Sequence, residues 1–305
     1  MTSPSGTQRV VAVQTHLHRP EAVSAACDFV RSVTAHGLVV AAEPDVAEAL
    51  HECSPDTQVI DTNGTDGLEV VVVFGGDGTI LKAAEWALGK RVPVLGVNLG
   101  HVGFLAELEV SDLPQIVDQV IRRDYAIENR LTISVELQPD PQGEVTWRSF
   151  AVNEVSIEKL SRRKMIEVLA QVDGLPVSRW GCDGLLVSTP TGSTAYAFSA
   201  GGPVMWPELE AFLMVPLSAH ALFARPLVLG PDSEVVVDLV GGDAVLWCDG
   251  RRTVDAPLGS RVTVRRHENH LQVARLSAQP FTNRLVKKFG LSVEGFRSGY
   301  EHLSG

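Results

Sequence analysis

The stretch FGGDGTI, residues 74–80, places three glycines around one aspartate and one threonine. It directly follows the run LEVVVV (68–73), whose β-branched residues on both faces predict a strand that is covered on both sides. The residues after it, ILKAAEWALG (80–89), are rich in helix formers. The stretch therefore joins a buried strand to the N-terminus of a helix, and Gly89 is expected at the C-terminal cap of that helix.

A glycine-rich loop between a strand and a helix is suited to phosphate. Gly75, Gly76 and Gly78 permit close approach of the backbone, and the helix directs its positive N-terminus at the loop. Thr79 is expected to cap the helix, and Lys82 lies one turn further on, within reach of an anion. The loop matches neither the Walker sequence nor the dehydrogenase glycine fingerprint.

Asp77 is the unusual member of this loop, because a carboxylate repels phosphate. It gains a chemical role if it binds a metal ion, or if it accepts a proton or a hydrogen bond from a sugar hydroxyl. The alternative is a tight turn in which Asp77 only caps the helix. The loop by itself leaves these alternatives open.

The first 130 residues alternate strands and helices around this loop. Further strands are expected at RVVAVQT (9–15), HGLVVAAE (36–43) and RVPVLGVNLG (91–100), and further helices at 20–36, 46–53 and 111–123, the last capped by Ser111. Such alternation predicts a doubly wound, mostly parallel α/β domain.

From about Arg130 the pattern changes to short strands separated by turn signals, such as the hairpin turn expected at Asp249–Gly250. This predicts an antiparallel, β-sandwich-like domain, followed by a helix over PFTNRLVKKFGLSVEGF (280–296). We therefore expect an α/β domain for the phosphate donor, an all-β domain, and a helical tail that packs back on the first domain. Their expected limits are 1–128, 129–278 and 279–305.

Composition narrows the class of protein. With 305 residues, 45% of them hydrophobic, the chain can bury two cores, and the polar start and the lack of a long apolar run predict a cytoplasmic protein with no membrane partner. The net charge of −11 argues against nucleic acid as a partner. The cysteines at 27, 53, 182 and 248 form no Cys-x-x-Cys pair, so we expect buried thiols and neither disulfides nor a zinc site.

A second block, GCDGLLVSTPTGSTAYAFSAGGP (181–203), gathers hydroxyls and backbone donors around Tyr196. A ribose, a base edge and a pyrophosphate all require such donors, and a tyrosine ring can stack on a base. Upstream, Asn153–Glu154 places an amide beside a carboxylate at the start of an expected strand. An asparagine amide is the natural partner of an adenine edge.

Taken in order, the motifs GGDGT (75–79), NE (153–154) and DG…STPTGSTAY…AGGP (183–203) resemble those of bacterial NAD kinases. The resemblance also includes GVNLGHVGFLAE (96–107) and the tail FTNRLVKKF (281–289). It implies phosphorylation of the 2′-hydroxyl on the adenosine ribose of NAD, with ATP or polyphosphate as donor. It also implies an N-terminal domain like that of phosphofructokinases, and an all-β domain that binds NAD and forms a homodimer or homotetramer. A divalent ion is also expected, most simply Mg²⁺. Phosphoryl transfer spreads negative charge over the γ-phosphate oxygens, and the sequence shows no arginine cluster that could neutralise this charge alone.

The resemblance assigns roles residue by residue. It implies that Asp77 is the catalytic aspartate and that Gly78 lies beside it at the NAD. Asn153 and Glu154 match the pair that contacts the NAD adenosine, and Asp183 matches a carboxylate at the nicotinamide-riboside end. The other expected nucleotide-binding residues are Gly75, Gly76, Thr79, Lys82, Lys164, Thr191, Thr194, Ala195, Tyr196, Ala197, Phe198 and Ser199.

One position departs from the pattern of these kinases. Many carry a basic residue two positions before Asp183, where this chain has Gly181, so that contact is absent or is supplied from elsewhere, with Arg251 as a candidate. Two other functions stay open: a GGDGT-type lipid or sugar kinase, and a non-catalytic sensor that binds a dinucleotide. Whether Asp77 acts as a base or holds a metal ion also stays open.

Overall fold

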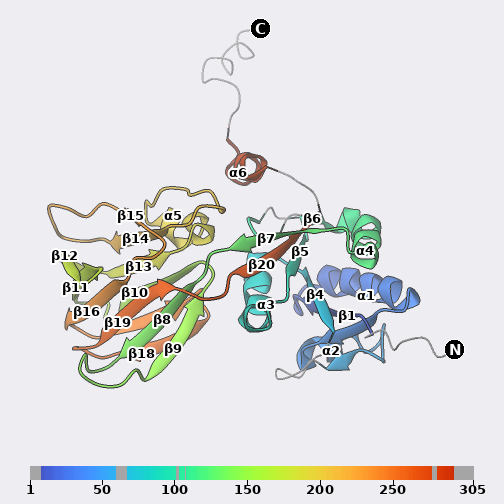
Figure 1. Ribbon diagram of the computed structural model, residues 1–305, viewed down its shortest axis with the longest axis horizontal. Coiled ribbons are helices and arrows are strands. Elements are labelled where there is room, and N and C mark those ends of the chain that lie inside the picture. The colour runs from blue at the N-terminus through green and yellow to red at the C-terminus, as the bar shows by residue number, and fades with distance from the viewer. Residues whose placement is uncertain (1–7, 60–66, 101–102, 107, 277–279, 292–305) are drawn as a thin grey trace, which may run out of the picture. The chain divides into compact units, whose positions relative to one another are not determined.

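The computed structural model describes residues 8–59, 67–100, 103–106, 108–276 and 280–291. The chain divides into two compact units (Figure 1). Met1–Glu128 and Gln272–Gly305 form the first, and Asn129–Leu271 forms the second. Within the described ranges, no helix has both the length and the apolar character needed to cross a membrane.

The first unit is built on an eight-stranded sheet with the order β3-β2-β1-β4-β5-β20-β7, and β6 pairs with β5. The neighbours of β1, β4 and β5 run parallel to them, as the alternation of strands and helices predicts. The strands are β1 (Val10–Thr15), β2 (Val39–Ala42), β3 (Gln58–Val59), β4 (Leu68–Phe74), β5 (Val94–Asn98), β6 (Leu108–Glu109), β7 (Ala126–Arg130) and β20 (Leu271–Arg275). The helices are α1 (Pro20–Ala35), α2 (Pro44–Leu50), α3 (Asp77–Lys90), α4 (Leu113–Arg122), the 3₁₀ helix η1 (Val110–Asp112) and α6 (Phe281–Phe289).

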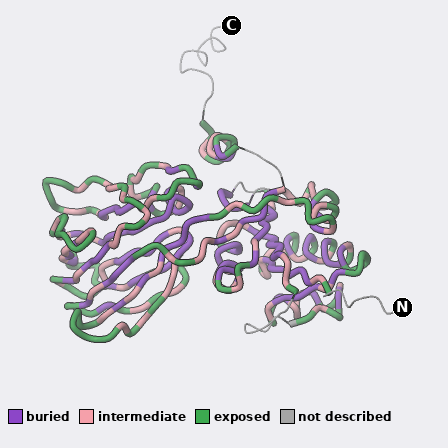
Figure 2. Tube along the Cα trace, in the orientation of Figure 1, coloured by how far each residue is buried: buried purple, intermediate pink, exposed green. Residues whose placement is uncertain are grey.

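Strand β4 lies at the centre of the core of this unit (Figure 2). Its residues Val70–Phe74 are each 0% exposed, because helices cover both faces of the sheet. The ring of Phe74 packs against Phe29 of α1, with ring centroids 5.6 Å apart. The end of β4, where the glycine-rich loop begins, is therefore fixed by the packing of the core.

The second unit consists of two six-stranded antiparallel sheets, with the orders β15-β14-β13-β10-β17-β18 and β12-β11-β16-β19-β8-β9. Inward-facing residues of both sheets form one hydrophobic core around Trp180, which confirms the predicted sandwich. The strands are β8 (Ile133–Gln138), β9 (Trp147–Ala151), β10 (Glu154–Lys159), β11 (Ile166–Val172), β12 (Leu175–Cys182), β13 (Gly184–Ser188), β14 (Phe212–Leu217), β15 (Leu227–Leu229), β16 (Val235–Gly241), β17 (Ala244–Cys248), β18 (Arg252–Ala256) and β19 (Arg261–Arg266). The helical turns are η2 (Thr191–Thr194) and α5 (Tyr196–Ser199).

Three helix ends differ from the sequence-based expectation. Gly89 lies inside α3, which Arg91 ends in the left-handed conformation at φ +54°. Thr79 does not cap α3, because Gly76 occupies the N-cap position and Thr79 lies within the first turn. Ser111 does not cap the next helix, because Glu109 and Asp112 form a capping box around η1.

The C-terminal part also differs from expectation. The expected all-β domain extends to residue 278, but β20 pairs in parallel with β5 in the first sheet. A short apolar strand carries no signal for the sheet that it joins, so the sequence could not show this. The expected tail helix ends at Phe289, since Gly290 takes the left-handed conformation, and residues 292–305 lie outside the described residues. Within the first unit, α6 contacts Phe104 through Phe281 and Phe289.

The cysteines require a correction. Cys27 of α1 and Cys53, just after α2, form a disulfide with Cα atoms 5.6 Å apart. They are 26 residues apart in sequence, and only the packing of α1 and α2 brings them together. Cys182 and Cys248 are free and buried as expected, and burial raises the pKa of their thiols to about 11 and about 12.

Candidate active site

The three glycines of the GGDGT loop serve different purposes. The N–H of Gly75 donates to the carbonyl of Val97 at 2.9 Å, and a Cβ at Gly75 would lie 2.7 Å from the Cβ of Thr79. Gly75 therefore lets the loop pack closely on the first turn of α3. A Cβ at Gly76 or Gly78 would meet nothing within 4 Å, so these two leave the helix N-terminus open to a ligand.

The carboxylate of Asp77 accepts backbone N–H groups from one segment of the same unit. These come from Phe104 and Leu105, both at 3.0 Å, and from Ala106 at 3.4 Å. A Cβ at Gly103 would collide with the same carboxylate. Among the described residues, Asp77 is thus the one expected site residue whose side chain hydrogen-bonds to residues 103–106. Its direction is fixed before any substrate binds.

Lys82 is engaged differently from expectation. Its ammonium lies 2.9 Å from Asp45 Oδ2 and 3.4 Å from Glu43 Oε2, at the start of α2. Burial lowers the pKa of Lys82, but the two carboxylates outweigh this and raise it overall. The cation predicted to face an anion is therefore held by acidic side chains one turn along α3.

The second motif block brings together segments that are far apart in sequence. Strand β10 begins at Glu154, and β13 pairs with it so that Glu154 lies opposite Ser188. Thr189 Oγ1 then donates to the carbonyl of Val152 at 2.5 Å, and a Cβ at Gly192 would collide with the carbonyl of Asn153. The TPTGST loop is thus packed directly on Asn153–Glu154.

The remaining expected residues of this block divide by exposure. Thr191 and Ala197 are buried, whereas Tyr196 and Phe198 are about 40% exposed and can present their rings to a ligand. Thr194 and Ala195 are half-buried, and Ser199 is exposed. Lys164 lies exposed in the loop between β10 and β11, and its ammonium forms no ion pair with another described residue.

A lysine from another strand lies beside Asp183, two residues after Gly181, the position at which this chain lacks a basic residue. The ammonium of Lys159, at the end of β10, forms a close ion pair with Oδ1 of Asp183. The N–H of Lys159 also donates to the carbonyl of Asp183 at 3.0 Å. Lys159 therefore places a positive charge beside Asp183 from a neighbouring strand, which sequence spacing could not reveal.

Glu154 is a buried acid with an unusual protonation. Burial, and then the charge of Asp249, raises the pKa of Glu154 to about 8, so its carboxyl is protonated at neutral pH. One of its oxygens has no hydrogen-bond partner in the described part of the protein.

This acid predicts a pH-dependent stability. The folded state prefers the protonated form, so the stabilisation is complete below the ordinary pKa of 4.5 and is lost as the pH rises through about 8. We expect the melting temperature to fall between about pH 5 and pH 8, and Glu154→Gln to flatten that part of the profile. Identical pH profiles for the two proteins, measured by circular dichroism, would contradict this.

Asp249 was missed as a functional candidate. It forms the hairpin turn that the sequence predicts, with positive φ at Asp249 and Gly250 between β17 and β18. Its carboxylate, however, reaches Val152 and Asn153, almost one hundred positions away, and no local signal marks such a contact.

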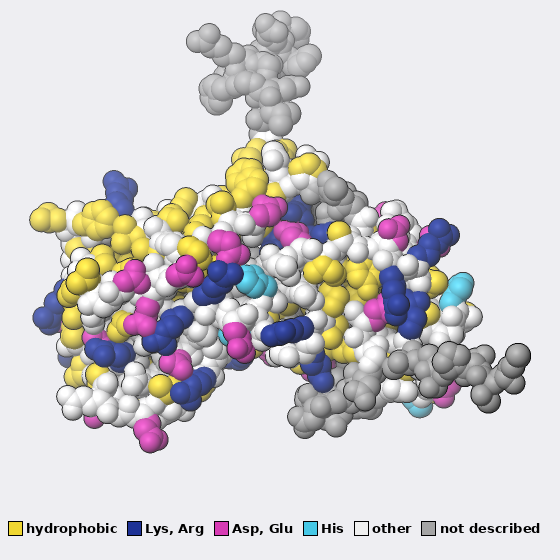
Figure 3. Space-filling model, viewed as in Figure 1, with side chains coloured by type: hydrophobic (Ala, Val, Ile, Leu, Met, Phe, Trp, Pro, Cys, Tyr) yellow, Lys and Arg dark blue, Asp and Glu magenta, His cyan; other side chains and the backbone are white. Residues whose placement is uncertain are grey.

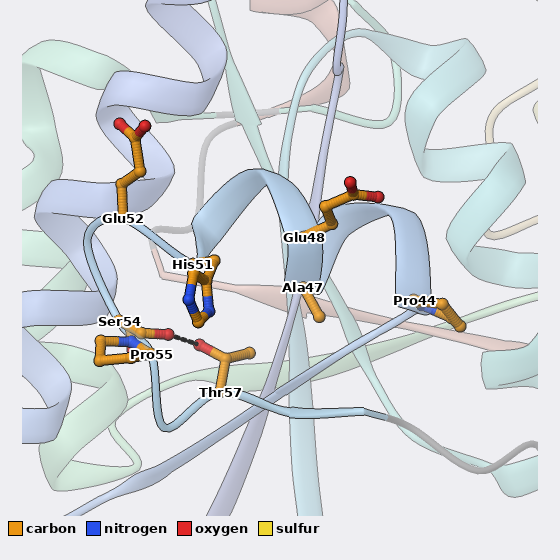
Figure 4. Close-up of a pocket in the computed structure, with 8 residues that line it drawn as sticks. All are labelled: Pro44, Ala47, Glu48, His51, Glu52, Ser54, Pro55 and Thr57. Atoms are coloured by element: carbon orange, nitrogen blue, oxygen red, sulfur yellow. Dashed lines mark hydrogen bonds between the residues drawn. The ribbon is translucent and has the colours of Figure 1, made fainter.

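A pocket of about 490 Å³ lies at α2 (Figure 4). Figure 4 shows Glu48 on α2, His51 directly after it, and the hydrogen bond that the Thr57 hydroxyl donates to the carbonyl of Ser54 in the following turn. None of the expected site residues lines it, and we assign it no role in catalysis. Among the described residues, no three His, Cys, Asp or Glu side chains form a metal-binding group.

The fold and these motifs, GGDGT in the α/β unit and NE with TPTGSTAY in the β unit, are those expected of a nucleotide-dependent phosphotransferase. Family models agree: the ATP-NAD kinase N-terminal domain matches residues 11–125, and the ATP-NAD kinase C-terminal domain matches residues 152–276. The chain belongs to the ATP-NAD kinase family.

Individual relatives point the same way. The chain is 55% identical to an NAD kinase of Cutibacterium acnes, over 98% of this chain and 94% of that protein. It is 48% identical to an NAD kinase of Leifsonia xyli, over 95% of this chain and 97% of that protein.

Two solved structures share the fold. An NAD kinase from Archaeoglobus fulgidus in complex with ATP has a TM-score of 0.69 and 25% identity, covering 93% of this chain and all of that one. Yeast NADH kinase in complex with NADH has a TM-score of 0.85 and 23% identity, covering 95% of this chain and 90% of that one.

Proposed function

We propose that this NAD kinase transfers the terminal phosphate of ATP to the 2′-hydroxyl of the adenosine ribose of NAD, giving NADP. The observation that carries the assignment of sites is the packing of the TPTGST loop on Asn153–Glu154. It holds the Asn153 backbone in place, while the Asn153 amide has no protein partner among the described residues and is half-buried. An amide held in this way is suited to the edge of an adenine.

Asp77 supplies the base in this proposal. A ribose hydroxyl is a weak nucleophile at neutral pH, so a carboxylate within hydrogen-bond reach accelerates transfer by accepting its proton. The backbone N–H groups of Phe104 and Leu105 orient the carboxylate, and the open backbone at Gly76 and Gly78 leaves room for phosphate and sugar. The N-terminus of α3 stabilises the negative charge of the phosphates.

The residues at the loop fit a metal ion that arrives with the nucleotide. Mg²⁺ bound to nucleotide phosphates keeps several waters and needs only one or two protein carboxylates. Asp77 is the one acidic side chain of the GGDGT loop, and since its oxygens accept backbone N–H groups and it supplies the base, it would contact the ion through one of these waters. When bound, the ion would neutralise charge on the transferred phosphoryl group.

Asn153→Ala is expected to weaken NAD binding by about 1–3 kcal/mol, because the edge of the adenine is left buried and unpaired. Calorimetric titration of NAD into the variant measures this loss. Asn129→Ala, which changes an exposed asparagine of β7, is the matched control and should bind NAD normally. Unchanged NAD affinity in Asn153→Ala would give Asn153 a purely structural role.

The choice of acceptor separates this proposal from its alternatives. The protein is incubated with ATP, magnesium and, in parallel, NAD, a diacylglycerol or sphingoid lipid, or a hexose phosphate. NADP from NAD alone supports the proposal, and phosphorylated lipid or sugar supports another GGDGT-type kinase. Tight NAD binding with no turnover of any acceptor supports a sensor. Replacing ATP with polyphosphate identifies the donor.

We also propose that the protein works in the cytoplasm as a homodimer or homotetramer assembled through the all-β unit. Large hydrophobic side chains are exposed over its β14, β15 and α5 region (Figure 3). They include Phe198, Trp206, Leu209, Leu222, Phe223 and Val228. Exposed apolar surface of this kind favours a subunit contact.

A further inference from the structure

Asp249 binds the backbone of the Asn153–Glu154 motif through a single carboxylate. It accepts the N–H of Asn153 at 2.7 Å, that of Val152 at 3.0 Å and that of Glu154 at 3.4 Å. The side chain of Asp249 is only 2% exposed. Three consecutive amides directed at one buried carboxylate fix the course of the chain at this point.

The carboxylate is itself anchored. Arg252 donates to Oδ2 of Asp249 at 2.6 Å, and its guanidinium lies 3.9 Å from the centre of the Phe150 ring. Phe150 belongs to β9, which leads into the motif. Asp249 therefore cannot shift toward or away from residues 152–154 without breaking a charged hydrogen bond.

The opposite side of the same peptide units is also held. The carbonyl of Asn153 accepts the N–H of Thr189 at 2.8 Å and the hydroxyl of Ser188 at 3.1 Å. Donors and acceptors of the Asn153 backbone are thus both engaged, and only its side chain is left for a ligand. The direction of that side chain depends on the N–H bonds to Asp249.

We propose that Asp249 is a positioning residue for NAD: by binding the amides of residues 152–154, it directs the Asn153 amide at the adenine edge. The inference rests on the proposed binding of adenosine by Asn153. Asp249 does not touch the substrate, so its removal should weaken NAD binding without changing the use of ATP.

Asp249→Asn tests this, because the charge is lost and only one accepting oxygen remains, which can accept the three N–H groups or the Arg252 hydrogen bond but not both. We expect Kd and KM for NAD to rise about tenfold, the effect of losing one charged hydrogen bond, with kcat and the KM for ATP within about twofold of wild type. Asp173→Asn is the matched control. Asp173 also has positive φ in a hairpin turn, and its carboxylate accepts the N–H of Glu234 at 2.8 Å, but it does not contact the motif.

A purely structural Asp249 would lower the melting temperature and leave the KM for NAD of the folded protein unchanged, which would overturn the inference. Equal rises in KM for NAD in Asp249→Asn and Asp173→Asn would also overturn it. If Asp249→Asn does not fold, Arg252→Gln, which removes the hydrogen bond that anchors Asp249, is expected to raise the KM for NAD about threefold and leave the KM for ATP unchanged. Normal NAD kinetics in Arg252→Gln would then refute the inference. Wild-type protein that forms no NADP would refute the proposed function as well, whereas NADP formation with normal NAD kinetics in the variant refutes only the role of Asp249.

Discussion

Asp77→Asn is expected to lower turnover by about 10²–10⁴-fold, while NAD affinity stays within a few-fold of wild type. Asparagine keeps the shape of the side chain and one accepting oxygen, so the hydrogen bond from Leu105 can persist, whereas the bond from Phe104, which reaches the other oxygen, is lost. It cannot accept the proton of the ribose hydroxyl. The loss therefore falls on the chemical step, and single-turnover measurement of NADP formation with saturating NAD and ATP isolates it.

Two further variants separate a base from a residue that only holds its loop. Gly103→Ala places a methyl group against the Asp77 carboxylate, so it disturbs the carboxylate without removing its charge. It should lower turnover less than Asp77→Asn. Asp112→Asn, at the capping box before α4, is the matched control and should leave turnover unchanged. Near-normal turnover in folded Asp77→Asn would contradict the assignment of a base, and unfolding would make Asp77 chiefly a structural residue of the loop.

Removing divalent ions is expected to abolish NADP formation. The triphosphate carries several negative charges, and the described part of the loop region offers the N-terminus of α3 and few free cations, since Lys82 is paired with Asp45 and Glu43. Activity after exhaustive chelation should fall to the assay background and return when magnesium is added. Full activity in the presence of excess chelator would contradict a metal requirement.

The sequence predicted the α/β unit well because its signals are local. The run LEVVVVF is buried on both faces, and an element of this kind has few alternatives. Helix ends were predicted less well. Arg91 and Arg123, both ordinary residues, end α3 and α4 in the left-handed conformation, which sequence preference assigns to glycine.

Features that depend on contacts between segments distant in sequence could not be predicted. Cys27 and Cys53 carry no spacing signal for a disulfide, and β20 joins the first sheet after the whole β unit has intervened. These features depend on tertiary packing, which propensity and periodicity do not encode.

The same distinction holds at the candidate site. The motifs GGDGT, NE and TPTGSTAY were identifiable because each is continuous, and the structure packs the last two together. Asp249, Lys159 and Gly103 were not singled out. Each acts on a motif residue from a distant position, Asp249 through its carboxylate, Lys159 through its ammonium and Gly103 through the absence of a side chain.

The most direct test of the account is the position at which phosphate is transferred to NAD. Purified protein is incubated with ATP, magnesium and NAD, and the product is supplied to a dehydrogenase that accepts NADP but not NAD, with ³¹P NMR locating the new phosphate. The account predicts reduction by that dehydrogenase and a monoester resonance from a 2′-phosphate on the adenosine ribose. Consumption of ATP without NADP, or a phosphate on any other hydroxyl, would contradict it.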